Sequence, residues 1–504
     1  MKSPAETGST GASALRDRGA WLGLVVGAYG LFMTVLVLAR GGGYYVVVPR
    51  LAYVLPLAVV GTVAALAALD VAGERVSAVG WLGLIVAAGV GCNFLVYWLK
   101  FGSDVWGLLL PLAHPTGIDF RDGLYDPAAA FSTVQSGWPP LTLLVGRPFT
   151  LFSFSTAYLI QVAALVAIAL GSTVLSAALA VKAAFEPDLS GQQRQVDARL
   201  LGFVMGLWLL TSYGFMYEVE RGNIDLYALL FSLLSVHLAI RLPKSPWPSS
   251  AMLAIAIGLK LYPAVLVVIL LWRYRWRAVL PVAAGVLAVM LVAGPANLRD
   301  SFGTLGKVES NVVALWWGNH SAAALDHVLQ GTTRWAPSWL GYPLLVVPLT
   351  LWAVTLVILV RRGWSDRGAV VAAAACVPLM GIVPSISHDY RLVLCVFPLT
   401  VLAATVSTMR REPGAVWTML FGVLALAMIF LGRSSLVVAP SLQASKYTML
   451  VVVQLLLLAV VLMTGQSERA GTAVRGATAP PVSYPSGPAG SWSAEASEKA
   501  RSGR

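Results

Sequence analysis

Long apolar segments separated by short polar turns dominate the chain between residues 21 and 465. An apolar segment of about 17 to 25 residues is long enough to cross a bilayer as a helix. One shorter pair is broken at Lys260 and Pro263, and counting it as two crossings predicts about 12 to 14 transmembrane helices. We therefore expect an all-α, polytopic membrane helix bundle. The predicted spans are 21–39, 51–69, 79–99, 157–182, 200–217, 225–242, 249–258, 261–272, 278–295, 338–360, 368–384, 391–408, 414–432 and 447–464.

The two ends of the chain differ from this apolar part. Residues 1–20 and 466–504 are rich in Ser, Gly, Ala, Pro and charge. Such segments bury too little apolar surface to fold by themselves. We expect a flexible cytoplasmic N-terminus (1–20), one transmembrane domain (21–465) and a disordered cytoplasmic tail (466–504).

Composition and charge support a multi-pass protein of the cell membrane. The chain is 58% hydrophobic and 12% charged, with a mean hydropathy of +0.77, which exceeds what a soluble core requires. Its net charge of +12 is explained by basic loops held on the cytoplasmic side and by contact with anionic membrane lipids. We therefore expect no nucleic-acid partner. With both termini inside, the two long loops, 100–156 and 296–337, face away from the cytoplasm.

The first long loop contains short amphipathic pieces between turn signals. Residues 141–152 are apolar but too short to span comfortably, and Arg147-Pro148 interrupts them. This pattern is typical of an interfacial helix that lies in the headgroup plane. Such a helix would help to guide a lipid substrate to a site.

The segment GFMYEVERGNIDLYALLF (214–231) carries charges between two apolar stretches. Ionisable residues at membrane depth are costly, so they usually line a cavity or pair inside it. Arg221 either pairs with Glu218 or Glu220, or holds a phosphate oxygen through two parallel hydrogen bonds. In the second case Asn223 and Asp225 would bind sugar hydroxyls or orient the arginine.

Carboxylates and one lysine form two further candidates. Asp119, Asp122 and Asp126 lie in GIDFRDGLYDP, on the external side. A carboxylate there either acts as general base on a sugar hydroxyl or caps a short loop helix. Lys260, in GLKLYPAVL, either binds an anion such as phosphate or extends to the membrane surface.

Two later turns carry amide, imidazole and guanidinium groups. In WWGNHSAAALDHVL, Trp316 and Trp317 precede Asn319 and His320, which predicts either a sugar-binding platform or an interfacial aromatic belt. In PSISHDYRLVL, His388 and Arg391 complete a phosphate clamp, or Asp389 and Arg391 form a turn salt bridge. We expect no metal, because no two His residues have ligand spacing on one helix and no thiol accompanies them.

These motifs together resemble the GT-C superfamily of membrane glycosyltransferases, and in particular the bacterial glycosyltransferase family 87. The resemblance rests on Asp-Phe in the first external loop, Trp-Pro-Pro closing it, ERGNID, GLKLYP, GNHS and SHDYRL, over about residues 79–410. It implies a GT-C-like bundle that acts outside the cytoplasmic membrane. The implied reaction transfers a mannose-like or arabinofuranose-like sugar, with inversion, from a polyprenyl-phosphate-linked donor to a cell-envelope glycolipid or polysaccharide acceptor.

The resemblance also suggests roles for individual residues. By position, Asp119 matches the catalytic aspartate of the first loop, although Asp122 lies close enough to be the alternative. Lys260, His320 and His388 match polar positions near the lipid phosphate and the sugars. Two features depart from the family pattern: two extra N-terminal spans precede the loop, and Trp138 stands where tyrosine is more frequent.

The resulting hypothesis needs no cofactor and assigns three roles. The base is Asp119. The donor phosphate would be bound by Lys260, Arg221, His388 and Arg391. The sugar or acceptor would be bound by Asp122, Asn223, Asp225, Asn319 and His320.

Two other classes of protein compete with this hypothesis. A transporter or flippase of lipid-linked sugars also places polar clusters between broken helices, although carriers usually have repeated halves and this chain has none. A non-catalytic subunit of envelope-polysaccharide assembly is the third alternative.

Overall fold

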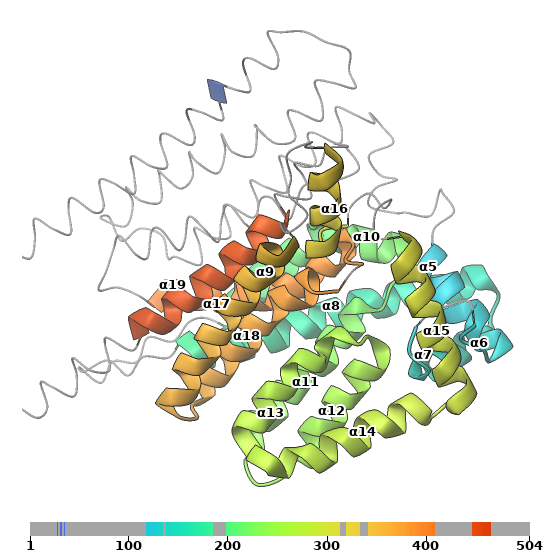
Figure 1. The fold of residues 1–504 in the computed structure, drawn as a ribbon, viewed down its shortest axis with the longest axis horizontal. Coiled ribbons are helices and arrows are strands. Elements are labelled where there is room, and N and C mark those ends of the chain that lie inside the picture. The colour runs from blue at the N-terminus through green and yellow to red at the C-terminus, as the bar shows by residue number, and fades with distance from the viewer. Residues whose placement is uncertain are drawn as a thin grey trace, which may run out of the picture. The chain divides into compact units, whose positions relative to one another are not determined.

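All regular secondary structure that the computed structural model describes is helical (Figure 1). The described residues are 28, 31, 32, 35, 117–134, 138–184, 198–312, 319–332, 341–384, 386–408 and 446–464. The predictions that fall outside these residues are the spans 51–69, 79–99, 414–432 and most of 21–39, the two tails, and the pair Trp316 and Trp317. Within the described ranges, the expected all-α membrane helix bundle is confirmed.

The helices follow the predicted apolar segments, with breaks at the polar turns. Their bounds are α5 Ile118–Phe120, η3 Arg121–Tyr125, α6 Asp126–Ala130, α7 Leu141–Gly146, η4 Arg147–Leu151, α8 Phe154–Ala184, α9 Ala198–Thr211, α10 Tyr213–Arg221, α11 Asp225–Arg241, α12 Trp247–Leu259, η5 Tyr262–Leu266, α13 Val267–Tyr274, η6 Arg275–Ala278, α14 Val279–Leu291, α15 Pro295–Val312, α16 Ala322–Thr332, α17 Gly341–Arg362, α18 Asp366–Ile382, η8 Asp389–Cys395 and α19 Val396–Thr408. A last helix covers Lys446–Thr464.

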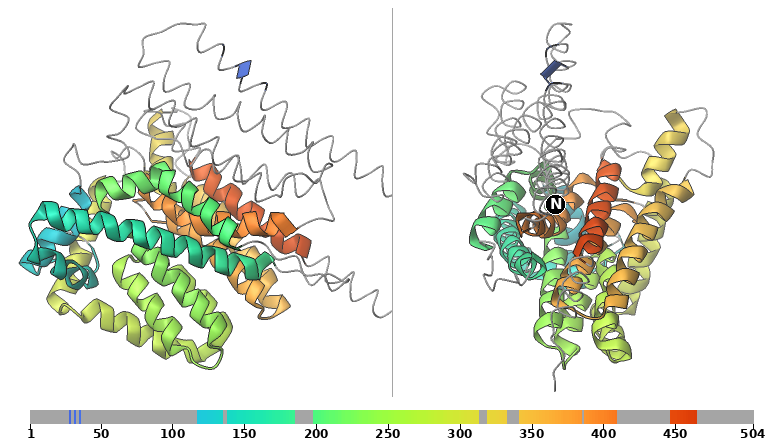
Figure 2. Two further views of the ribbon diagram at one scale, coloured as in Figure 1. Left: turned by 180° about the vertical axis from the view of Figure 1, so that it is seen from behind. Right: turned by 90° about the vertical axis from the view of Figure 1, so that its left-hand side faces the viewer.

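Fewer helices are long enough to span a membrane than hydropathy predicts for the same segments. In the described part of the chain α8, α17 and the last helix qualify, and the number rises to at most 5 if each of two bent pairs is one span. The bends are 57° between α9 and α10, and 89° between the η5–α14 run and α15 (Figure 2). Hydropathy averages over a window, so it does not separate a full crossing from shorter helices joined at a break.

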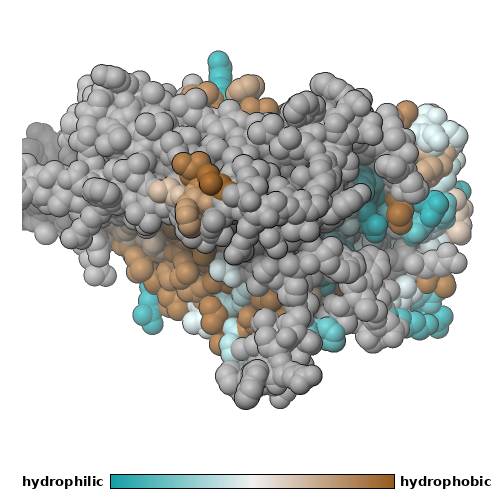
Figure 3. Space-filling view, turned by 90° about the horizontal axis from the view of Figure 1, so that it is seen from above, coloured by the Kyte–Doolittle hydropathy of each residue, from teal (hydrophilic) through white to brown (hydrophobic). Residues whose placement is uncertain are grey.

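Helix α8 packs against many of the other helices. It contacts α9, α11, α18 and α19, while α11 packs on α12 and α12 on α14 (Figure 1). Its buried face includes the small residues Ala169, Ala177 and Ala180, which let neighbouring helix backbones approach closely. Other positions of α8, among them Leu159 and Val174, are exposed. Apolar side chains also gather on part of the surface in Figure 3, as expected for a protein that faces lipid.

Several helix breaks meet near one end of α8 and α11. α5 and η8 both contact α10, and η5 and η8 both contact α11. The break between α10 and α11 depends on Gly222, whose φ of 68° is the left-handed conformation that glycine adopts most readily. Backbone turns at membrane depth are tolerated where protein buries them. These turns are therefore where the polar side chains of the bundle can converge.

Residues 141–151 form one short apolar helix, α7 followed by the 3₁₀ turn η4. This agrees with the helix expected in the first long loop. Its place in the headgroup plane stays a prediction. The Arg147 guanidinium, which interrupts the apolar run, donates a hydrogen bond of 2.9 Å to the carbonyl of Ala128, so this charge holds the loop together.

Candidate active site

The segment that carries Asp119 is fixed against the end of α10. The backbone N–H of Gly117 donates to the carbonyl of Glu220 at 2.7 Å. The hydroxyl of Tyr158, on α8, donates to the carbonyl of Val219 at 2.6 Å. Phe120 is fully buried, and its ring lies edge-on to another aromatic ring 5.3 Å away. Asp119 is thereby held beside the turn that follows α10.

Asp119 is bound by two side chains from this turn. Arg221 Nη2 lies 2.5 Å from Asp119 Oδ1, and Asn223 Nδ2 donates to Asp119 Oδ2 at 3.0 Å. Of the two sequence alternatives for Arg221, an ion pair does form, but its partner is Asp119. The two side chains keep 19% and 15% of their surface exposed, so a ligand can reach this carboxylate.

Asp225 is fully buried between two cations. Its Oδ1 lies 3.5 Å from Lys260 Nζ, and its Oδ2 lies 3.4 Å from Arg391 Nε. Lys260 is the residue at which α12 ends, and Arg391 belongs to η8. The lysine therefore has a buried anionic partner and does not extend to the surface.

Aromatic rings complete the surroundings of both cations. Lys260 Nζ lies 3.9 Å from the centroid of the Trp138 ring, and Arg391 Cζ lies 4.8 Å from that of Tyr262. Such contacts stabilise a cation by about 0.5–2 kcal/mol, depending on desolvation. They also replace water on one side of each charge without neutralising it. Both cations thus remain able to interact with an anion.

Glu218 is a further buried carboxyl beside Asp225. One of its oxygens accepts a hydrogen bond of 3.2 Å from the backbone N–H of Leu226, which holds the N-terminus of α11. The other has no hydrogen-bond partner among the described residues. Sequence reasoning noted Glu218 only as an alternative partner for Arg221. Its position seven residues before Asp225 gives no sign of this contact.

The turn between α18 and η8 brings His388 and Tyr390 to the same region. The ring of Tyr390 lies 5.5 Å from that of His388 and 5.6 Å from that of Tyr217 on α10. Tyr390 is buried and packs between these two rings. Sequence reasoning assigned it no role, although the residue lies inside SHDYRL.

Asn319 and His320 lie against this same turn and are completely or almost completely buried. The Asn319 side chain accepts a hydrogen bond of 2.9 Å from the backbone N–H of Ser387. The His320 ring lies 3.1 Å from the Ser387 hydroxyl.

Asp122, in contrast, is exposed and pairs with its neighbour Arg121 at 2.9 Å. Nine of the ten predicted site residues therefore belong to linked contacts, and Asp122 faces outward.

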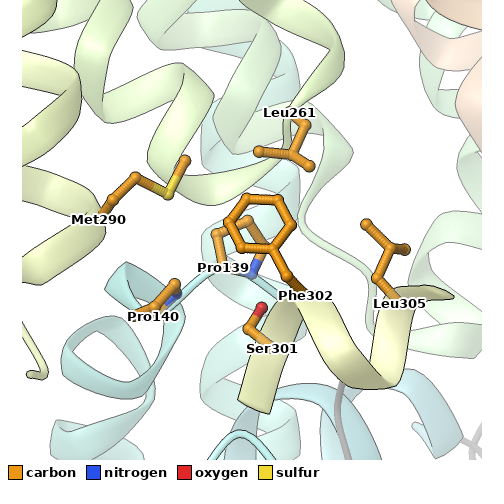
Figure 4. Close-up of a pocket in the computed structure, with 7 residues that line it drawn as sticks. All are labelled: Pro139, Pro140, Leu261, Met290, Ser301, Phe302 and Leu305. Atoms are coloured by element: carbon orange, nitrogen blue, oxygen red, sulfur yellow. The ribbon is translucent and has the colours of Figure 1, made fainter. Parts of the chain in front are cut away.

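The lining of an apolar pocket includes Pro139 and Leu261, which directly follow Trp138 and Lys260 in the chain. The space within it, open solvent included, is about 190 Å³. Figure 4 shows Leu261, Phe302 and Met290 turned toward it. Pro139, Pro140, Ser301 and Leu305 complete the lining.

Among the residues that the structure describes, no three His, Cys, Asp or Glu side chains are arranged to hold a metal ion.

The sequence profile described as glycosyltransferase family 87 matches residues 138–386. The chain is a family 87-like glycosyltransferase. A curated relative from Mycobacterium tuberculosis is 27% identical over 320 residues, which cover 60% of this chain and 71% of the relative. A second, from Mycolicibacterium smegmatis, is 26% identical over 349 residues, covering 65% and 76%. Both are named polyprenol-phosphate-mannose-dependent alpha-(1-2)-phosphatidylinositol mannoside mannosyltransferases.

The matched segment of this glycosyltransferase contains only part of the linked cluster. It includes Arg221, Asp225 and Lys260, but Asp119 precedes it and Arg391 follows it. Both outlying residues nevertheless contact residues inside the segment. The ion pairs of the candidate site therefore extend beyond the part recognised by the profile.

Proposed function

We propose that this glycosyltransferase transfers a mannose-like or arabinofuranose-like sugar from a polyprenyl-phosphate-linked donor. The acceptor is a cell-envelope glycolipid or polysaccharide, and the transfer inverts the anomeric centre. The reaction takes place on the extracytoplasmic side of the cell membrane, within a transmembrane domain of residues 21–465. One observation carries this proposal: a partly open carboxylate, Asp119, pairs with Arg221, and four residues after Arg221 the buried Asp225 pairs with the cations Lys260 and Arg391.

Asp119 is suited to act as the general base. Inversion requires the acceptor hydroxyl to attack the anomeric carbon from the face opposite the phosphate while a base takes its proton. The hydrogen bonds from Arg221 and Asn223 hold the carboxylate in one orientation.

The cations are suited to stabilise the departing lipid phosphate. As the glycosidic bond breaks, negative charge grows on the phosphate oxygen, and fixed donors aimed at that position lower the barrier. Lys260 and Arg391 both pair with Asp225. His388 contacts Tyr390, the neighbour of Arg391 in the chain, and Arg221 pairs with Asp119. The apolar pocket lined by Leu261, the residue that follows Lys260, offers apolar surface in this part of the protein.

The distribution of charge supports an extracytoplasmic site. The cluster lies where α11 begins and α12 ends, so the α11–α12 loop belongs to the opposite end of these helices. That end is basic and exposes Arg241, Lys244, Arg275 and Arg277. A hydrogen bond from Tyr274 to the carbonyl of Leu242 joins its two loops. Basic loops are retained in the cytoplasm, so the cluster would face outward.

The test is turnover by purified, detergent-solubilised protein supplied with a polyprenyl-phosphate-linked sugar and a glycolipid acceptor. Asp119→Asn should lower kcat by about 100- to 10,000-fold, since it removes the base. Asp126→Asn, an exposed acid on the same loop, is the control and should match wild type.

Near wild-type turnover of Asp119→Asn would remove Asp119 from this role. Loss of turnover in Asp122→Asn alone would assign the base to Asp122. Wild-type protein that forms no glycosylated product in detergent, yet moves the lipid-linked sugar across sealed vesicles, would instead make it a flippase.

A further inference from the structure

A second buried polar contact joins the turn 319–321 to the turn 386–388. The backbone N–H of His320 donates to the carbonyl of Ser387 at 2.9 Å. The Asn319 Oδ1 accepts from the backbone N–H of Ser387 at 2.9 Å and from that of Ser321 at 3.2 Å. Asn319 and His388 form an isolated antiparallel bridge. Asn319, His320, Ser321, Ser387 and His388 are all at most 4% exposed.

The turn that Asn319 holds is the one that carries His388 and Arg391. The backbone N–H of Arg391 donates to the carbonyl of His388 at 2.9 Å. Its Nη1 donates to the carbonyl of Ile386 at 2.8 Å. The guanidinium is therefore bound to the backbone of the turn, and a shift of the turn would move the cation relative to Asp225.

The chemistry of an amide suits this contact. A side-chain carbonyl oxygen has two lone pairs and can accept two N–H groups without bringing a charge into the interior. A backbone N–H that is buried without a partner is costly, so few proteins tolerate it. Loss of Asn319 would leave the Ser387 and Ser321 N–H groups in that state. The turn would then relax toward other acceptors.

We infer that Asn319 is a positioning residue, which sets the donor-phosphate cations by fixing the 386–391 turn. It does so through Ser387 and does not itself need to touch the sugar or the acceptor. This inference rests on the proposed function for the role of the cations. The docking of the turn is a separate claim that can be measured without activity.

The experiment compares Asn319→Ala with Asn319→Asp and with a matched control. Asn297→Ala is the control, because Asn297 Oδ1 also accepts a backbone N–H, that of Thr133, at 3.1 Å, but it binds a loop outside the cluster. The first measurement is hydrogen exchange of the amides of residues 386–391. The second is the KM for the polyprenyl-phosphate sugar and, separately, for the acceptor.

Asn319→Ala should speed exchange in this turn and raise the donor KM by about tenfold to a hundredfold, the cost of a misplacement on the order of 1 Å. The acceptor KM should stay the same. Asn319→Asp retains the acceptor oxygen and should restore protection of the Ser387 amide and part of the donor KM. Asn297→Ala should change neither. If Asn319→Ala does not fold, Ser387→Ala, which removes only the hydroxyl contact with His320, should give a smaller rise in the donor KM.

The inference is overturned if the amides of residues 386–391 exchange at the same rate in Asn319→Ala and Asn297→Ala and the two variants turn over equally. It is also overturned if Asn319→Ala raises the donor KM and the acceptor KM by the same factor. A wild-type protein that makes no product would refute the proposed function, and the exchange comparison would then decide alone whether Asn319 docks the turn.

Discussion

Removing the charge of Asp225 should destabilise this protein strongly. Asp225 is fully buried, with Lys260 Nζ at 3.5 Å and Arg391 Nε at 3.4 Å. At an effective dielectric constant of about 20, one unit pair at 3.5 Å interacts with about 5 kcal/mol. Asparagine keeps the size of the side chain but leaves two buried cations without their carboxylate. Measured losses for breaking a buried pair are about 3–5 kcal/mol, and we expect Asp225→Asn to fall in this range.

The assay is denaturant unfolding in mild detergent, followed by tryptophan fluorescence, with a second variant that tests the cause. Adding Lys260→Met to Asp225→Asn removes one of the uncompensated cations, so about half of the lost free energy of unfolding should return. Asp366→Asn is the control, because Asp366 pairs with Lys182 at 3.6 Å while half of its side chain is exposed. Exposed pairs contribute about 0–1 kcal/mol.

Two results would refute this reasoning. Asp225→Asn could unfold like Asp366→Asn, which would mean that water or a relaxed backbone already screens the two cations. Alternatively, the losses in free energy of unfolding caused by Asp225→Asn and by Lys260→Met could simply add in the double variant. The charges would then not depend on one another, and the ion pairs would not be what makes the buried carboxylate necessary.

Two further predictions concern how the cluster is held. Gly222→Ala should destabilise the fold by about 2–4 kcal/mol, because alanine is disfavoured at a φ of 68° and its Cβ would lie 2.5 Å from that of Phe120. Gly171→Ala is the control, because a Cβ at that position meets nothing within 4 Å. It should be neutral or stabilising in the same unfolding assay. Trp138→Leu should raise the donor KM several-fold, because it removes a cation–π contact with Lys260 that contributes about 0.5–2 kcal/mol. Trp138→Phe retains an aromatic ring and should raise the donor KM less. Equal donor KM values for Trp138→Leu and wild type would contradict this prediction.

Local sequence properties predicted the class of fold, and the resemblance of the motifs to family 87 predicted the class of enzyme. Apolar segments with charges confined to a few turns are sufficient to predict a helical membrane bundle, because the cost of burying a charge in lipid applies to every residue separately. The turns ERGNID, GLKLYP and SHDYRL could be recognised as candidate chemistry for the same reason. The match to family 87 and the mannosyltransferase relatives agree with the glycosyltransferase predicted from these motifs.

Only the tertiary structure decided which of these residues meet. The sequence left open whether Arg221 pairs with Glu218 or Glu220 or holds a phosphate, and its partner in the structure is Asp119, 102 positions away. Asp122, three residues from Asp119, is exposed and pairs with Arg121, although a spacing of three would place both acids on one face of a regular helix. Asn319 holds the turn before His388. Such pairings depend on how several broken helices pack together, and no local pattern of polarity contains that information.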